Sequence, residues 1–219
     1  MPHKLYYYKA TGRANQIRLT LAAAGVSWED VYPEAFPPTE EEKQGWRDIG
    51  KNSTTNVPML AMEVGSVFTQ SLAIVRAAAR MGDRSLTPKD DKELYLYDKI
   101  ISDADDLRTV AYSSFLSWGS PQSAVNKYIQ ESLPLHLGNF ERQLIGDYFV
   151  GSSLTAADIC AYDAIVSFGS YRVEGVLDNY PKLKAFAARI EAHPPIAKYM
   201  SSPEYEGLMK FEKISVKDV

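Results

Sequence analysis

The hydrophobic pattern divides the chain into a first part with short strands and a second part that is helical. Apolar runs of strand length occur at 4–8 and 26–32, and again on both sides of a Gly-Ser turn at 65–66. Helical spacing occupies 14–24 and 71–81, and a glycine follows each of these runs. The acidic stretch between the two helical runs predicts a short solvated helix. The pattern of the first part therefore predicts a mixed α/β domain in the order β-α-β-(α)-β-β-α.

Beyond Gly82 the strand signal disappears. The polar stretch 83–91 contains Pro88 and is the predicted linker between two domains. Helical spacing then returns over residues 93–118, 121–145, 155–168 and 181–192, with a short helix at 194–200. The predicted domains are therefore an α/β domain at 1–82 and an all-helical domain at 92–219.

One helix start in the second part has a recognisable cap. Thr155 and Asp158 have the spacing of a capping box, in which two side chains satisfy N–H groups at the start of a helix. We expect Asp158 to stabilise the fold rather than to act in catalysis.

Composition narrows the class of protein. The 219 residues are 45% apolar and 24% charged, as in soluble globular proteins. A net charge of −4 without a basic run argues against a nucleic-acid partner. No apolar run is long enough to span a membrane, and the N-terminus lacks a signal-peptide core. The single cysteine, Cys160, excludes an internal disulfide and lies in an apolar run, so we expect a buried thiol and a reducing, cytoplasmic setting.

Two features of the stretch 55–76 predict a ligand site. Val57 and Pro58 enter an apolar strand, where a proline usually marks an edge or a turn. Gln70 and Ser71 begin a helix, where N–H groups and the helix dipole favour a bound carboxylate. A simple helix cap explains the second pair equally well.

Taken together, these elements resemble the cytosolic glutathione transferases over nearly the whole chain. The motifs that carry the resemblance are the tyrosines at 6–8, Gly12-Arg13, Asn56-Val57-Pro58, Gln70-Ser71, Asp105-Asp106-Leu107-Arg108, the segment 151–158 and the segment 202–205. The tyrosine pattern is similar to the sigma, pi, mu and alpha classes. The resemblance implies a thioredoxin-like first domain, an all-helical second domain, a homodimer, glutathione as co-substrate and a role in detoxification.

The resemblance implies that Tyr7 is the catalytic residue. A thiol with a pKa of about 8.5 is mostly protonated at neutral pH, and a hydroxyl that donates to the sulfur stabilises the thiolate. Tyr6, Tyr7 and Tyr8 all carry hydroxyls, but neighbours on a strand point to opposite faces. The family motifs align Tyr7 with the catalytic tyrosine and Tyr8 with a position beside the electrophile. The alternative is that all three tyrosines only pack the strand.

The resemblance also implies how glutathione is held. The implied binding set is Tyr7, Trp46, Lys51, Asn56, Val57, Pro58, Gln70, Ser71 and Asp106. A cis bond before Pro58 would let the backbone of Val57 pair with the cysteinyl unit as an added strand. Gln70 and Ser71 would hold the γ-glutamyl carboxylate.

Several of these assignments have local alternatives. Trp46 and Lys51 are matched to the glycyl carboxylate, with Arg47 as a rival and a solvated charge as the alternative for Lys51. Asp106 is implied to reach the γ-glutamyl ammonium across a dimer, or else it belongs to a hydrated acidic face. Arg13 is implied to support the surroundings of Tyr7, or else it is an ordinary arginine at a helix start.

The electrophile pocket is expected between the domains and is assigned to Tyr8 and Tyr112, although apolar residues at helical spacing are more often core. Some sigma-like members place a divalent ion near carboxylates at the dimer interface. Ser102 occupies one of those positions here, so no metal is predicted.

The sequence therefore predicts a homodimeric glutathione transferase that stabilises the thiolate of glutathione for attack on apolar electrophiles. One alternative is a glutathione-dependent isomerase similar to prostaglandin D synthase, which uses the same thiolate without consuming it. Another is a non-catalytic relative, such as a crystallin-like structural protein or the binding module of an elongation factor subunit. Neither a nucleic acid nor a membrane is an expected partner.

Overall fold

The computed structural model describes residues 2–35, 37–49, 57–116 and 120–214. The chain forms two compact units, and each unit combines two segments of the sequence. The first unit contains Met1–Thr87 and Lys198–Lys210, and the second contains Pro88–Ala197 and Phe211–Val219. The first unit is a mixed α/β structure and the second is helical, which confirms the predicted fold class.

The first unit is built on a four-stranded mixed sheet. Its strands are β1 (His3–Tyr6), β2 (Trp28–Val31), β3 (Met59–Ala61) and β4 (Val67–Thr69), in the spatial order β2-β1-β3-β4. β1 pairs in parallel with β2 and antiparallel with β3, which in turn pairs antiparallel with β4. Leu5 of β1 and Met59 and Leu60 of β3 are fully buried, because a strand between two others contributes side chains to the core.

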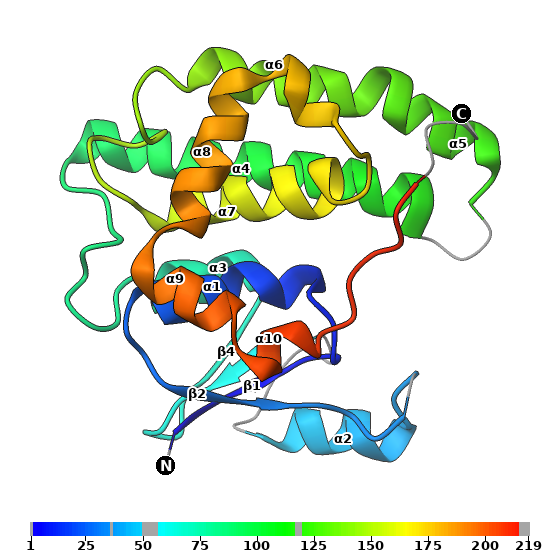
Figure 1. Cartoon of the computed structure of the whole chain (residues 1–219). Helices are drawn as coiled ribbons and strands as arrows, with labels where there is room; N and C mark the ends of the chain where they lie inside the picture. The colour runs from blue at the N-terminus through cyan, green and yellow to red at the C-terminus, as the bar shows by residue number, and fades with distance from the viewer. Residues whose placement is uncertain (1, 36, 50–56, 117–119, 215–219) are drawn as a thin grey trace. The chain divides into compact units, whose positions relative to one another are not determined.

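Helices cover this sheet. They are α1 (Asn15–Ala23), which follows a 3-10 turn at Gly12–Ala14, α2 (Glu40–Asp48), α3 (Ser71–Ala78) and α10 (Pro203–Glu206). Figure 1 shows α1 and α3 on one side of the sheet and α2 on the other. α2 begins with a capping box: the Glu42 N–H donates to Thr39 Oγ1 at 3.2 Å, and the Thr39 N–H donates to Glu42 Oε2 at 2.9 Å.

The second unit packs its helices around α7. Its helices are α4 (Asp91–Ala111), α5 (Gln122–Lys127), α6 (Leu133–Gln143), α7 (Ala156–Ala164) and α8 (Pro181–Glu191), and α9 (Pro194–Met200) leads back to the first unit (Figure 1). Every residue of α7 is buried, as expected for a helix at the centre of a helical core. In the described part of the chain, no helix is both long and apolar enough to cross a bilayer.

The long helical stretches contain π-helical turns that the periodicity did not predict. Such turns lie at 112–116 after α4, at 128–132 between α5 and α6, and at 165–170 after α7. The single helix predicted at 121–145 is therefore α5, a π-helical turn and α6. A π-helical turn differs from an α-helical turn only in its i→i+5 hydrogen bonds, and the spacing of apolar residues alone does not reveal it.

The predicted capping box at the start of α7 is confirmed. The N–H and the hydroxyl of Thr155 both donate to Asp158 Oδ2, at 2.9 and 2.7 Å. The Phe149 N–H donates to Asp158 Oδ1 at 2.7 Å. Burial raises the pKa of the Asp158 carboxyl to about 6, although these three donors favour the ionised form. Asp158 thus ties the preceding loop to the central helix.

Candidate active site

Tyr7 lies just beyond β1 and points its hydroxyl at the turn before α1. Its backbone N–H donates to the Val31 carbonyl at 3.2 Å, and its side chain is only 7% exposed. The backbone N–H of Arg13 donates to the Tyr7 hydroxyl oxygen at 2.9 Å. Accepting this bond uses a lone pair, so the hydroxyl keeps its own hydrogen as a donor.

Gly12 makes this approach sterically feasible. Its φ of +41° lies in the region that favours glycine, and a Cβ at this position would overlap the hydroxyl and ring of Tyr7. A residue with a side chain at position 12 would therefore displace Tyr7 from the turn.

Gly12→Ala is expected to lower kcat/KM by about fivefold to 30-fold, because the overlap and the positive φ together cost about 1–2 kcal/mol. Steady-state kinetics with glutathione and a model electrophile measure the effect. Gly65→Ala is the matched control, since Gly65 has a φ of +85° but its Cβ would meet nothing within 4 Å. Equal losses in the two variants would show that backbone strain, and not the position of Tyr7, explains the result.

Five of the predicted residues line one cavity in the first unit. The cavity has a volume of about 340 Å³ and is lined by Arg13, Val57, Pro58, Gln70 and Ser71. The Val57–Pro58 peptide bond is cis, as the resemblance implies. The cavity therefore adjoins the turn whose N–H group holds the Tyr7 hydroxyl.

The start of α3 forms one wall of this cavity. Gln70 occupies the N-cap position with a φ of 69°, and its side chain makes no capping hydrogen bond. Ser71 is the first residue of α3 and is 7% exposed. The alternative of a simple side-chain cap is thus not supported for Gln70. The first-turn N–H groups of α3 are of the kind that bind carboxylates.

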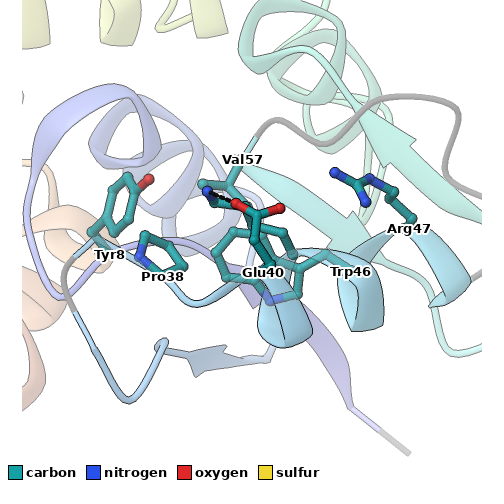
Figure 2. A pocket seen from close by; sticks show the side chains of 7 residues that line it. Tyr8, Pro38, Glu40, Trp46, Arg47 and Val57 are labelled. Atoms are coloured by element: carbon teal, nitrogen blue, oxygen red, sulfur yellow. Dashed lines mark hydrogen bonds and ion pairs between the residues drawn. The ribbon is translucent and has the colours of Figure 1, made fainter.

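A second cavity adjoins the first at Val57. Its volume is about 370 Å³, and Figure 2 shows its lining. The lining residues are Tyr8, Pro38, Glu40, Lys43, Trp46, Arg47 and Val57. The Trp46 side chain is only 8% exposed and lines one side of the cavity. Arg47 Nη1 donates a hydrogen bond to Gln44 Oε1 at 2.8 Å. Three of the predicted residues, Tyr8, Trp46 and Val57, thus share this cavity with the rival Arg47.

Sequence reasoning missed three residues of this lining: Pro38, Glu40 and Lys43. Lys43 Nζ lies 2.6 Å from Glu40 Oε1, and this ion pair holds the pKa of the Glu40 carboxyl below its usual range. Residues 40, 43 and 47 are spaced three and four apart, so they share one face of α2. That spacing was the available signal, but a charged stretch is more often a solvated face.

Two predicted binding residues, Lys51 and Asn56, lie outside the described residues. The choice between Lys51 and Arg47 for the glycyl carboxylate therefore stays open. Arg47 and Lys43 are the cations that the structure describes in the second cavity.

The remaining predicted residues belong to the second unit. Asp106 is exposed on α4. Tyr112 is half-buried, and its ring centroid lies 5.5 Å from that of Phe168 and 6.1 Å from that of Phe211. Both assignments stay predictions. Among the described residues, no group of three or more His, Cys, Asp or Glu side chains is placed to hold a metal ion.

Comparison with known proteins identifies the family. Residues 3–80 match the family model described as "Glutathione S-transferase, N-terminal domain", and residues 105–203 match "Glutathione S-transferase, C-terminal domain". The chain belongs to the glutathione S-transferase family, as the sequence predicted, with the thioredoxin-like first domain and the transferase role that the family carries.

Individual relatives agree with this assignment. Glutathione S-transferase alpha-5 of Rattus norvegicus is 30% identical over 210 residues, which cover 91% of this chain and 90% of the relative. Glutathione S-transferase 3 of Gallus gallus is 31% identical, with 90% and 84% covered. Glutathione S-transferase P 2 of Bufo bufo is 28% identical, with 91% and 92% covered.

Proposed function

We propose that Tyr7 holds bound glutathione as its thiolate for attack on an apolar electrophile. The observation that carries this proposal is the 2.9 Å bond from the Arg13 N–H to the Tyr7 hydroxyl, because Arg13 also lines the first cavity. This bond keeps the hydroxyl beside the space where the cysteinyl unit would lie. Arg13 thus supports the catalytic tyrosine through its backbone.

The first cavity suits the γ-glutamylcysteinyl part of the peptide. Gln70 and Ser71, with the N–H groups of the first turn of α3, would hold the γ-glutamyl carboxylate. The backbone of Val57, between the two cavities, would pair with the cysteinyl unit. The extended peptide would therefore run from α3 past Val57 toward α2.

The second cavity suits the glycyl end. A carboxylate is favoured by the positive charge of Arg47, whereas the charge of Lys43 is already paired with Glu40. Trp46 provides an apolar side of the cavity. Lys51 and Asn56 belong to the same proposed binding set. Tyr8 lines this cavity, and we place it, with Tyr112, beside the electrophile.

The proposed chemistry needs no group other than the peptide and its electrophile. The Tyr7 hydroxyl donates to the sulfur, which lowers the pKa of the thiol so that its proton passes to water near neutral pH. The thiolate then attacks an electrophilic carbon and forms a C–S bond. The displaced electron pair leaves with a leaving group or, for a conjugated carbonyl, moves to the oxygen and is protonated by water.

The proposal includes a cytoplasmic homodimer in which Asp106 contacts the γ-glutamyl ammonium bound by the partner subunit. Asp106→Asn is then expected to weaken glutathione binding by up to about fivefold, because an exposed ion pair contributes about 0.2–1 kcal/mol. Calorimetry measures the Kd. Asp103→Asn is the control, since Asp103 Oδ2 already pairs with Lys99 Nζ at 2.6 Å. A wild-type Kd in the Asp106 variant would remove this residue from the site.

Three measurements on the wild-type protein separate the functions that this family allows. Conjugation of glutathione to a model aromatic electrophile is the expected activity. Isomerisation of an endoperoxide without conjugation would favour the isomerase. Calorimetric binding without turnover of either substrate would indicate a non-catalytic binding protein.

A further inference from the structure

Arg18 is a fully buried, charged residue of α1. It contacts Tyr7 and the short segment that follows Tyr7 in the chain. Its side chain is 0% exposed. Nε donates to Asp30 Oδ1 of β2 at 2.9 Å, and Nη1 donates to the Ala10 carbonyl at 2.7 Å. Burial of a guanidinium is costly even when it is paired, so an apolar residue would fill this position at lower cost.

The Ala10 carbonyl belongs to the short segment between Tyr7 and the Gly12 turn. On one side this segment pairs with Met209, whose N–H donates to the Lys9 carbonyl at 3.0 Å and whose carbonyl accepts from the Thr11 N–H at 2.9 Å. On the other side it is held by Arg18. The two ends of the bond between Arg13 and the Tyr7 hydroxyl are therefore joined by a segment that is fixed from both sides.

Arg18 also contacts Tyr7 directly. Its guanidinium carbon lies 6.0 Å from the centroid of the Tyr7 ring, within the range of a cation–π contact. Asp30 is held in turn by the Trp28 Nε1–H, which donates to Asp30 Oδ2 at 3.2 Å. Both carboxylate oxygens of Asp30 are thus occupied, and the guanidinium has a fixed position beneath the tyrosine.

The hydrogen bonding of this group is incomplete. Arg18 Nη2 is buried and has no hydrogen-bond partner among the described residues, and the same holds for the hydroxyl of Tyr199, which packs edge-on against Trp28 with ring centroids 5.2 Å apart. A buried charge with an unsatisfied donor is a poor way to gain stability. A role in placing Tyr7 accounts for it better.

We propose that Arg18 is a positioning residue for Tyr7: it fixes the segment 8–11 and the tyrosine ring so that the hydroxyl stays directed at the sulfur of glutathione. This inference rests on the proposed function of Tyr7. If Arg18 only stabilises the fold, its replacement should lower the stability of the protein without changing the ionisation of bound glutathione.

The second unit contains a matched control. Arg108 is also 0% exposed, its Nη2 donates to Asp163 Oδ2 at 3.0 Å, and its guanidinium lies 5.8 Å from the centroid of the Phe168 ring. Arg108→Met removes the same kind of buried group without touching the segment of Tyr7. It is therefore expected to lower Tm and to leave the pKa of the bound thiol unchanged.

The test compares the variants Arg18→Met, Arg18→Lys and Arg108→Met. Three properties are measured for each: the Tm of thermal unfolding, the pKa of the thiol in the glutathione complex by ultraviolet titration of the thiolate, and the pH profile of kcat/KM. Arg18→Met is expected to raise the pKa of the bound thiol by about half a unit to one unit and to move the pH profile equally, with a smaller shift for Arg18→Lys. In a Tyr7→Phe background, Arg18→Met should add no further shift, because its effect passes through Tyr7.

A lower Tm with an unchanged thiol pKa in both Arg18 variants would overturn the proposal, and so would a full additional shift in the Tyr7→Phe background. If Arg18→Met does not fold, Arg18→Lys and Asp30→Asn give the same readout, because the first replaces the guanidinium by an ammonium with a single binding point and the second removes the charge that holds Arg18 Nε. An unchanged thiol pKa in Tyr7→Phe alone would instead refute the role of Tyr7. A raised pKa there, without a shift in the Arg18 variants, would refute only the role of Arg18.

Discussion

Replacement of Tyr7 by phenylalanine is expected to lower kcat/KM for conjugation by about 10- to 150-fold, because a hydrogen bond to a charged group contributes about 1.5–3 kcal/mol. The ring is retained, so its contacts in the first unit remain. The Kd of glutathione should change little, since its carboxylates are bound elsewhere. Kinetics and calorimetry on the same preparation separate the two effects.

Tyr8→Phe is the matched control for this variant. It removes a neighbouring hydroxyl that lies in the second cavity, where the Tyr8 side chain is half-buried. We expect its effect to depend on the electrophile and to leave the pKa of the bound thiol unchanged. A Tyr7→Phe enzyme with wild-type turnover would assign the thiolate chemistry to another group.

The second large effect is expected from Gln70→Glu. Side-chain size and the backbone conformation at φ 69° stay the same, but a second carboxylate would face the γ-glutamyl carboxylate. Like charges brought together at a binding site cost several kcal/mol, so affinity for glutathione should fall by at least about 100-fold at neutral pH. Binding should recover in part at low pH, where the introduced carboxyl is protonated.

Gln70→Asn is the control for this substitution. Asparagine tolerates a positive φ and keeps an amide, so only the reach of the side chain changes. We expect the affinity of this variant for glutathione to fall by less than about tenfold, because only one hydrogen bond is weakened. If the two variants bind glutathione equally, Gln70 does not face a carboxylate and the proposed direction of the peptide is wrong.

The sequence was sufficient for the strands and the main helices of the first unit because their signals are local. Short apolar runs of strand length and helical spacing, with glycines after residues 24 and 81, predicted the order of strands and helices in the first unit. The grouping of Lys198–Lys210 with this unit depends instead on contacts such as that from Thr11 to Met209, 198 residues apart in sequence. No local pattern reports such a pair, and the predicted domain ranges stay a prediction.

The residues of the site likewise fall into those that a local motif reveals and those that only the folded structure reveals. Tyr7, Val57-Pro58 and Gln70-Ser71 belong to short motifs and could be selected from the sequence. Lys43 and Arg18 could not be selected. In the sequence, a lysine on an acidic helix and an arginine in an apolar helix look the same as charges that are simply solvated. Their significance comes from what lies opposite them: a cavity for Lys43, and Tyr7 and Asp30 for Arg18.

The most direct test of the central claim is the pKa of the thiol in the binary complex with glutathione, measured by ultraviolet titration of the thiolate in the wild-type protein and in Tyr7→Phe. The account predicts a pKa in the wild type well below the value of about 8.5 for an unperturbed thiol. It also predicts that the pKa in Tyr7→Phe rises by at least about one unit. Equal pKa values in the two proteins would contradict it.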